Sequence, residues 1–452
     1  MISLFDDKQF FRSLFSLAIP IALQQLVAAS VNMLDTIMIG RLGTVEIAGV
    51  GLANQIFFLY QLTLYGICSG GAIFTAQFWG KGDIKGIRKN HGFCLTLNLI
   101  AASIYAFAAA FFPEVLISIY SKDEAVIHAG AVYLKTLAPS FIAFAVSFAF
   151  TLSLRSVEKV RLSIVATTIA FSINLVMTYL FIFGAGPIPA MGVKGAALAT
   201  VFARILETSI LVIVSYIKKY TIAGNFRELF SFNLVYARQF FRITLPVIIN
   251  EMLWSLGITF QNFIFARTNT DAIAAFNITS TISHLAWVLF MGLSGGVAVL
   301  IGKKIGEGDE KTARNYAAKT SVFIPLLALG ASFVIVPISQ IIPFIFNVNT
   351  DTITAATQML FILCAVYPFR AFNATVIVGI CRAGGDTVFS VVYDIAVMWS
   401  IALPLAAVMA FVFKSPVWAI YMAIAMDDIL KAFIGIWRLK SGRWLHNVIQ
   451  AM

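Results

Sequence analysis

The sequence predicts an all-α integral membrane protein with twelve transmembrane helices in two homologous halves. Three observations lead to this fold class. Of the 452 residues, 60% are hydrophobic and only 12% are charged, a composition typical of polytopic membrane proteins. Twelve apolar segments follow one another along the chain, each long enough to cross about 30 Å of hydrocarbon. An internal repeat without gaps relates the first half of the chain to the second.

The twelve apolar segments are separated by polar connections. Their approximate bounds are residues 14–40, 47–79, 92–112, 126–152, 162–184, 193–217, 240–266, 273–302, 320–345, 354–381, 387–413 and 416–438. Each segment holds roughly 20 residues or more, the length that a membrane-spanning helix needs at 1.5 Å per residue. After the second and eighth segments, Gly80–Asp83 and Gly306–Asp309 are typical of a helix end followed by a new helix cap.

The basic residues predict how these segments are oriented. With a cytoplasmic N-terminus and twelve spans, most of the 32 Lys and Arg residues fall on the cytoplasmic side. The basic residues on the other side are Arg41, Lys122, Lys194, Arg267 and Lys414. This bias follows the positive-inside rule and predicts that both termini lie in the cytoplasm. It also explains the net charge of +11 without nucleic acid as a partner.

The internal repeat has an offset of 226 residues. It matches Pro20 with Pro246 and Arg41 with Arg267. The longest matched set is Gly66, Gly70, Ala72, Gly80, Gly82, Asp83, Lys85 and Arg88, which recur as Gly292, Gly296, Ala298, Gly306, Gly308, Asp309, Lys311 and Arg314. Because each half has an even number of segments, both halves enter the membrane in the same direction, as in transporters built from parallel repeats. Glycines four residues apart, as at Gly66 and Gly70, predict closely packed helices.

The repeat predicts three parts of the chain. Residues 1–217 form the first six-helix lobe, residues 218–239 form a cytoplasmic linker, and residues 240–452 form the second lobe. The linker has room for an amphipathic stretch at the membrane interface around Phe226–Phe232.

The sequence contains no motif typical of an enzyme or a cofactor-binding protein. The four cysteines lie in apolar segments without CxxC spacing, and the four histidines are scattered. The glycine-rich connections do not follow a strand, so they do not predict a phosphate loop. There is no G-x-S-x-G nucleophile motif and no apparent cleavable signal peptide. We therefore expect no cofactor, no catalytic residue and no metal beyond Na⁺ at Asp35.

In the first half, Asp35 is the one ionisable residue between Arg12 and Arg41. A carboxylate inside a membrane-spanning helix costs several kcal/mol unless it is neutralised, paired or hydrated, so such residues often have a function. Asn174 and Thr178 share one helix face because they are four residues apart. Together with Thr200 and Asp35, they predict a site for Na⁺ or a proton. The alternative is that each Asn or Thr only makes a hydrogen bond between helices.

In the second half, the repeat places Gln261 opposite Asp35, and carboxylates appear elsewhere. Glu251 lies in the seventh segment beside Asn250, and Asp394 lies in the eleventh. These four residues are candidates for a substrate-binding cleft, and Glu251 has no cationic neighbour nearby in the sequence. Two intrahelical ion pairs are also predicted from i, i+3 spacing, which are Arg204 with Glu207 and Asp428 with Lys431.

Several motifs, taken together, resemble the multidrug and toxic compound extrusion (MATE) family. The motifs are LAIP at Leu17–Pro20, LDTIMIGRLG at Leu34–Gly43, Gly-x-Gly-Asp at Gly80–Asp83, INLVMTYLFIFG at Ile173–Gly184, GVKGAALAT at Gly192–Thr200 and CRAGGDT at Cys381–Thr387. The resemblance spans nearly the whole chain in the expected order. It implies two six-helix lobes around a central cleft, and export of cationic or amphipathic small molecules across the cytoplasmic membrane in exchange for Na⁺ or H⁺.

The resemblance also implies roles for individual residues. Asp35 matches the acidic residue of the family's cation site, and Asn174 and Thr200 match polar members of that site. Thr178 stands where many relatives carry a second acid. Glu251 lies about one turn before the family's seventh-helix Glu. An Asp in the tenth helix of some relatives is replaced by Asn373 or a neighbour.

Two other functions are compatible with a membrane protein of this kind. A lipid-linked saccharide flippase would need basic residues for phosphate, and Arg204, Arg370 and Lys135 are the candidates within the segments. An integral-membrane enzyme is disfavoured because no catalytic constellation is present. The expected partners of an antiporter are a small cationic amphipathic substrate and membrane lipids, and we expect a monomer.

Overall fold

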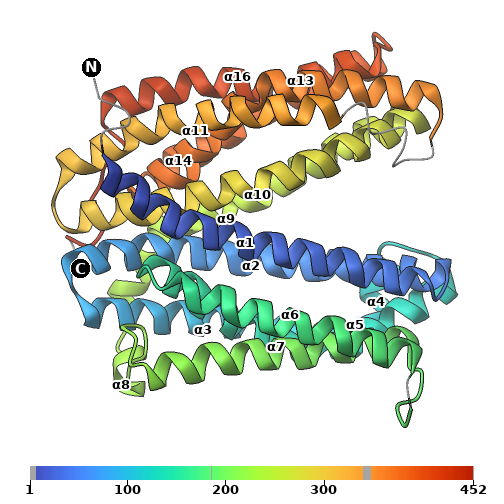
Figure 1. Ribbon diagram of the computed structural model, residues 1–452, viewed down its shortest axis with the longest axis horizontal. Helices are drawn as coiled ribbons and strands as arrows, with labels where there is room; N and C mark the ends of the chain where they lie inside the picture. The colour runs from blue at the N-terminus through green and yellow to red at the C-terminus, as the bar shows by residue number, and fades with distance from the viewer. Residues whose placement is uncertain (1–6, 185, 339–347, 451–452) are drawn as a thin grey trace. The chain divides into compact units, whose positions relative to one another are not determined.

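The computed structural model describes residues 7–184, 186–338 and 348–450, and every regular element of these residues is a helix (Figure 1). The helices of the first half are α1 (Lys8–Gly40), α2 (Thr44–Lys81), α3 (Ile84–Phe111), α4 (Pro113–Ser118), α5 (Glu124–Ser156), α6 (Val160–Phe183), α7 (Gly192–Ile217) and α8 (Phe226–Leu229). The helices of the second half are α9 (Leu234–Thr268), α10 (Thr270–Gly306), α11 (Glu310–Ile338), α13 (Thr350–Ala374), α14 (Thr387–Val397), α15 (Leu403–Phe411) and α16 (Val417–Ser441). The π-helical segment η1 (Thr375–Arg382) extends α13, and η2 (Met398–Ala402) joins α14 to α15.

Eleven helical stretches of the described residues are long and apolar enough to cross a membrane. The last long helix, α16, carries Asp427, Asp428 and Lys431 within its apolar stretch. The prediction of an all-helical membrane protein with about twelve long apolar helices is therefore confirmed. The end of the ninth predicted segment, residues 339–345, lies outside the described residues.

The chain forms two compact units. The first unit comprises Leu23–Thr244, and the second comprises the chain up to Ala22 and from Leu245 onward. In the first unit, α5 packs against α2, α3 and α7, and α6 packs against α7. The centre of this unit is apolar and aromatic. Within it, the Tyr60 hydroxyl donates a hydrogen bond of 2.6 Å to the Phe141 carbonyl.

In the second unit, α13 packs against α10, α11 and α16, and α10 also packs against α11. The Phe290 and Tyr367 rings meet edge to face at 5.3 Å between α10 and α13. The Ser332 hydroxyl of α11 donates a hydrogen bond of 2.9 Å to the Cys364 carbonyl of α13. These contacts keep α13 at the centre of the unit.

Two helices, α1 and α9, each have one part in the first unit and one part in the second. In both helices the boundary lies close to a proline that the repeat matches. The first part of α1 belongs to the second unit, where Lys319 pairs with Asp7 at 3.0 Å. The first part of α9 belongs to the first unit, where the Tyr236 hydroxyl donates to Asn90 Oδ1 at 2.8 Å. Pro20 and Pro246 lie inside these helices. A proline within a helix removes one backbone hydrogen bond.

Glycines that are matched by the repeat lie where the first parts of α1 and α9 pack. A Cβ at Gly70 would clash with Thr244 of α9, and a Cβ at Gly292 would lie 2.8 Å from the Ala18 carbonyl oxygen of α1. Thr244 and Ala18 are themselves related by the offset of 226 residues. The predicted close helix packing is confirmed at Gly70 and Gly292.

We expect Gly70→Val to lower the free energy of unfolding by about 1–3 kcal/mol, because the added side chain overpacks the contact with Thr244. Gly51→Val is the matched control on the same helix, since a Cβ at Gly51 meets nothing within 4 Å. Thermal unfolding of the purified variants in detergent measures the difference. Equal melting temperatures for the two variants would show that the Gly70 contact is not tight.

The connections after α2 and α10 have the predicted helix-end geometry. Gly82 and Gly308 are left-handed, with φ of 74° and 79°. The Asp83 carboxylate accepts a hydrogen bond from the Gly86 N–H, and the Asp309 carboxylate accepts one from the Thr312 N–H.

The connection before α9 is attached to the first unit. Arg88 Nη1 of α3 lies 2.8 and 3.0 Å from the two carboxylate oxygens of Glu228. The Asn225 N–H and the Arg88 guanidinium hold the pKa of Glu228 below its ordinary value. The Phe226 side chain is 76% exposed, which suits a segment at the membrane interface.

Candidate functional site

Asp35 is placed on the part of α1 that belongs to the first unit. Its carboxylate lies against the Thr178 hydroxyl of α6 and within electrostatic range of Arg204 of α7. Asn174 lies one turn before Thr178, and both side chains are buried. The structure therefore brings together residues that the sequence separates by about 140 positions (Asp35 to Asn174 and Thr178).

Three oxygen atoms at this place are buried without a hydrogen-bond partner among the residues that the structure describes. They are Asp35 Oδ1, Asn174 Oδ1 and Thr178 Oγ1. Buried polar atoms in proteins are almost always hydrogen-bonded, so unpartnered ones indicate a bound ion, a water molecule or a proton. A carboxylate, an amide carbonyl and a hydroxyl are ligands that suit a hard cation.

Thr200 lies on α7, four residues before Arg204. Its hydroxyl donates a hydrogen bond of 3.1 Å to the Ala196 carbonyl of its own helix. The buried Tyr133 hydroxyl lies against Thr200 and within electrostatic range of both Asp35 and Arg204. Tyr133 therefore links Thr200 to the surroundings of Asp35, and the Thr200 hydroxyl proton is directed to its own helix.

A polar chain leads away from Asp35 through the first unit. Arg204 Nη1 lies 2.9 Å from Glu207 Oε2, which confirms the predicted i, i+3 pair. Thr167 donates to Glu207 Oε1 at 2.7 Å, and Gln24 donates to Thr167 at 2.9 Å. Arg155 reaches Gln24 Oε1 at 3.5 Å. Glu207 therefore offsets part of the Arg204 charge that acts on Asp35.

The second unit holds a larger set of charged residues. Glu251 of α9 forms an ion pair of 2.7 Å with Arg382 of η1, and both side chains are mostly buried. No Lys or Arg stands near Glu251 in the sequence. The partner comes from a distant segment that only the tertiary structure brings close.

Lys431 connects three helices of the second unit. Its ammonium lies 2.6 Å from Asp427 Oδ2 on α16 and 3.0 Å from Asp394 Oδ1 on α14. Asn250 of α9 donates to Asp394 Oδ2 at 2.9 Å. The predicted pair of Lys431 with Asp428 is wrong, because the i, i+4 partner Asp427 faces Lys431 instead.

Asp428 is turned toward another group of residues. Arg370 Nε lies 3.6 Å from Asp428 Oδ2. Asn373 donates to the Asp428 backbone carbonyl at 2.7 Å, and Tyr393 donates to Asn373 Oδ1 at 2.7 Å. The π-helical segments η1 and η2 follow Asn373 and Asp394 along the chain, and π-helical turns often occur at functional sites.

Gln261 does not join this charged set. It is buried on α9, ten residues after Glu251, which corresponds to about 15 Å along a helix axis. Of the four second-half candidates, only Asn250 and Asp394 are joined by a hydrogen bond in the described part of the chain. Glu251 lies within electrostatic range of Asp394, while Gln261 lies apart.

Some residues of these sites were not predicted from the sequence. Tyr133 is one of many tyrosines in apolar segments, and no spacing distinguishes it. Arg382 is adjacent to a predicted segment end, where a Lys or Arg is ordinary. In the described part of the chain, no group of three or more His, Cys, Asp or Glu residues could hold a metal ion.

The MatE family model matches residues 20–180 and 246–408, which is more than half of the chain. A probable multidrug resistance protein NorM of Thermotoga maritima is 23% identical over 444 residues, covering 96% of this chain and 93% of that protein. The uncharacterized transporter YisQ of Bacillus subtilis is 24% identical over 442 residues, covering 98% and 96%.

Solved structures share the fold. A mutant of the Vibrio cholerae MATE transporter VcmN superposes with a TM-score of 0.88 at 16% identity, covering 97% of this chain and 98% of that one. A MOP superfamily transporter from Pyrococcus furiosus superposes with a TM-score of 0.86 at 17% identity, covering 95% and 96%. The helical architecture, the two matched regions and these relatives agree, and this chain is a multi-pass membrane protein that belongs to the MatE family of secondary transporters.

Proposed function

We propose that this protein is an ion-coupled antiporter that exports cationic or amphipathic small molecules across the cytoplasmic membrane. The names of relatives in Thermotoga maritima and other bacteria, which describe probable multidrug resistance proteins, support drug-like substrates. The observation that carries the proposal is the set of buried, unpartnered oxygens on Asp35, Asn174 and Thr178. In this proposal, Thr200 completes the coupling-ion site.

The ligand set favours Na⁺ over H⁺ as the coupling ion. A proton needs only the Asp35 carboxylate, whereas a cation that loses its water requires several oxygen ligands. Asn174 Oδ1 and Thr178 Oγ1 are both available for this purpose. Thr178 in place of a second acid leaves one negative charge at these three residues, which matches the charge of one Na⁺ ion.

Arg204 stabilises the charged Asp35 side chain when no ion is bound. A carboxylate without its ion is costly in a membrane protein. The Arg204 guanidinium lies within electrostatic range of Asp35 and reduces that cost. An ion that binds Asp35 then competes with the Arg204 charge, part of which is offset by Glu207. Ion and substrate shift the populations of the transporter's states according to their affinity for each state.

The charged set of the second unit supports a preference for cationic substrates. It contains one more carboxylate than cations. The acids are Glu251, Asp394, Asp427 and Asp428, and the bases are Arg370, Arg382 and Lys431. An excess negative charge in a poorly solvated site attracts a cation more strongly than it would in water. In our proposal, Glu251, Asn250 and Asp394 contact the cationic substrate, and Gln261, which lies apart from them, makes a separate polar contact.

A lipid-linked saccharide flippase is not favoured by the basic residues. Arg204 is paired with Glu207, and Arg370 is paired with Asp428. A phosphate group would have to displace these carboxylates. Of the three basic candidates, that leaves Lys135, an exposed residue on α5.

Dye transport in everted membrane vesicles tests the proposed function. A Na⁺ gradient and a pH gradient are imposed separately, and fluorescence reports the movement of a cationic dye. Our proposal requires transport driven by the Na⁺ gradient. Transport driven by the pH gradient alone would assign the proton as the coupling ion, and transport independent of both gradients would refute ion coupling.

The proposed topology places both termini and the 218–239 linker in the cytoplasm. All four native cysteines are buried, so they can be replaced to give a background without reactive thiols. Single cysteines at Ser231 and Lys440 are expected to react with an impermeant thiol reagent only from the cytoplasmic side. Labelling of either position in intact cells would contradict this topology.

A further inference from the structure

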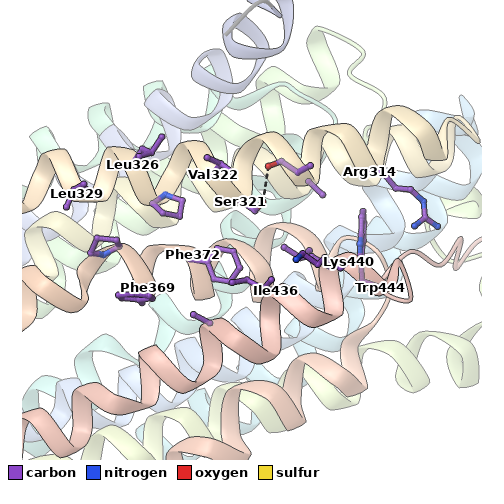
Figure 2. Close-up of a pocket in the computed structure, with 16 residues that line it drawn as sticks. Arg314, Ser321, Val322, Leu326, Leu329, Phe369, Phe372, Ile436, Lys440 and Trp444 are labelled. Atoms are coloured by element: carbon purple, nitrogen blue, oxygen red, sulfur yellow. Dashed lines mark hydrogen bonds between the residues drawn. The ribbon is translucent and has the colours of Figure 1, made fainter. Parts of the chain in front are cut away.

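A groove of about 730 Å³ runs between α11, α13 and α16 of the second unit. Figure 2 shows the side chains that line it, with Leu329 and Phe369 toward one end and Arg314 and Lys440 toward the other. The groove contains none of the charged residues assigned above to ion or substrate binding. Its volume lies within the range of small-molecule sites in proteins.

The walls of the groove are apolar along most of its length. Leu326, Leu329 and Phe369 line it and are partly exposed, by 52%, 44% and 39%. The Ser321 hydroxyl donates its hydrogen bond to the Ala318 carbonyl of its own helix, so it does not make the wall polar. Small residues such as Ala317 and Ala432 leave the space between the helices open.

The other end of the groove is basic. Arg314 and Lys440 line it, and both side chains are exposed. Gly442, which is left-handed and ends α16, leaves room for the Arg314 guanidinium beside it. The acid paired with Arg314 is Glu310, at 3.9 Å, and both are about half exposed or more. Such a long, exposed ion pair holds its partners weakly, so Arg314 is available to another anion.

The distance between the two ends matches one leaflet of a bilayer. Arg314 and Leu329 are fifteen residues apart on α11, or about 22 Å along the helix. Half of the hydrocarbon core is about 15 Å thick, and the remainder corresponds to the headgroup region. An apolar channel of this length, with two cations at one end, fits an acyl chain and an anionic headgroup.

We propose that this groove binds an anionic phospholipid, with one acyl chain against α11 and α13 and the phosphate at Arg314 and Lys440. Basic pockets between transmembrane helices are known to hold anionic headgroups. A water-soluble anion would gain nothing from the apolar walls, and a neutral apolar molecule would not need the two cations. The site therefore selects lipids by headgroup charge.

Lipid titration of the purified full-length protein tests the proposal. Native mass spectrometry in detergent measures the binding of phosphatidylglycerol and of phosphatidylcholine with identical acyl chains. The wild-type protein is expected to bind phosphatidylglycerol more tightly. Arg314→Ala/Lys440→Ala is expected to weaken phosphatidylglycerol binding by roughly thirtyfold, at about 1 kcal/mol for each basic residue, and to remove the preference.

Two further variants locate the lipid. Lys311→Ala/Arg443→Ala removes the same charge from residues that do not line the groove, and it is expected to keep the preference. Ala318→Trp fills the apolar part and is expected to weaken the binding of both lipids. The proposal is overturned if the wild-type protein shows no preference, if the control loses as much binding as Arg314→Ala/Lys440→Ala, or if Ala318→Trp has no effect. Displacement of the lipid by a transported dye, without any headgroup preference, would likewise overturn it in favour of a substrate pocket.

Discussion

Asp35→Asn is expected to abolish ion-driven export while the protein still folds and reaches the membrane. Asparagine keeps the shape of the side chain and removes its charge. Two opposite charges 4 Å apart interact by about 4 kcal/mol at an effective dielectric constant of 20. Losing this interaction would weaken binding of the coupling ion by roughly a thousandfold. Dye efflux from vesicles with an imposed ion gradient measures the loss.

Glu124→Gln is a suitable control for this substitution. It also removes one carboxylate, but from the exposed start of α5. Export by this variant should equal that of the wild-type protein. If well-expressed Asp35→Asn exports dye as fast as Glu124→Gln, Asp35 does not bind the coupling ion.

Glu251→Gln is expected to lower the free energy of unfolding by about 3–5 kcal/mol. The substitution removes the acid that faces Arg382, whose side chain is 4% exposed. Breaking a buried ion pair by removing one of its two members is strongly destabilising. Thermal unfolding of the purified variant in detergent measures this loss.

The double variant Glu251→Gln/Arg382→Met separates the ion pair from a role in substrate binding. It removes both charges, so part of the lost stability should return. A second outcome would assign Glu251 a different role. Suppose that Glu251→Gln melts like the wild-type protein, but loses more affinity for a cationic dye than for a neutral substrate. Then Glu251 contacts the substrate directly, and the ion pair is not essential to folding.

Hydropathy predicts most of the helices because it is a local property of the chain. An apolar stretch of 20 residues must satisfy its backbone within itself in a membrane, and a helix does so. The repeat also predicted the tight contacts at Gly70 and Gly292. The exchange of the first parts of α1 and α9 between the two units was not predictable, because each is continuous in sequence with its own half.

The grouping of residues around Asp35 was partly predictable, whereas the pairing of the charged residues in the second unit was not. Asn174 and Thr178 are one turn apart, so their common face follows from helix geometry. For Lys431, both Asp427 and Asp428 are within one turn, and the neighbouring helices decide which one pairs. The Glu251–Arg382 pair links α9 to η1 across the second unit, and local spacing carries no information about such a contact.

Direct ion binding tests the central claim most closely, because it needs no substrate. Purified protein is equilibrated with radioactive Na⁺, and bound ion is measured for the wild-type protein, Asp35→Asn and Glu124→Gln. We expect saturable Na⁺ binding by the wild-type protein and Glu124→Gln, and its loss in Asp35→Asn. Saturable binding of equal affinity in Asp35→Asn, or no Na⁺ binding by the wild-type protein, would contradict a Na⁺ site formed by Asp35, Asn174 and Thr178.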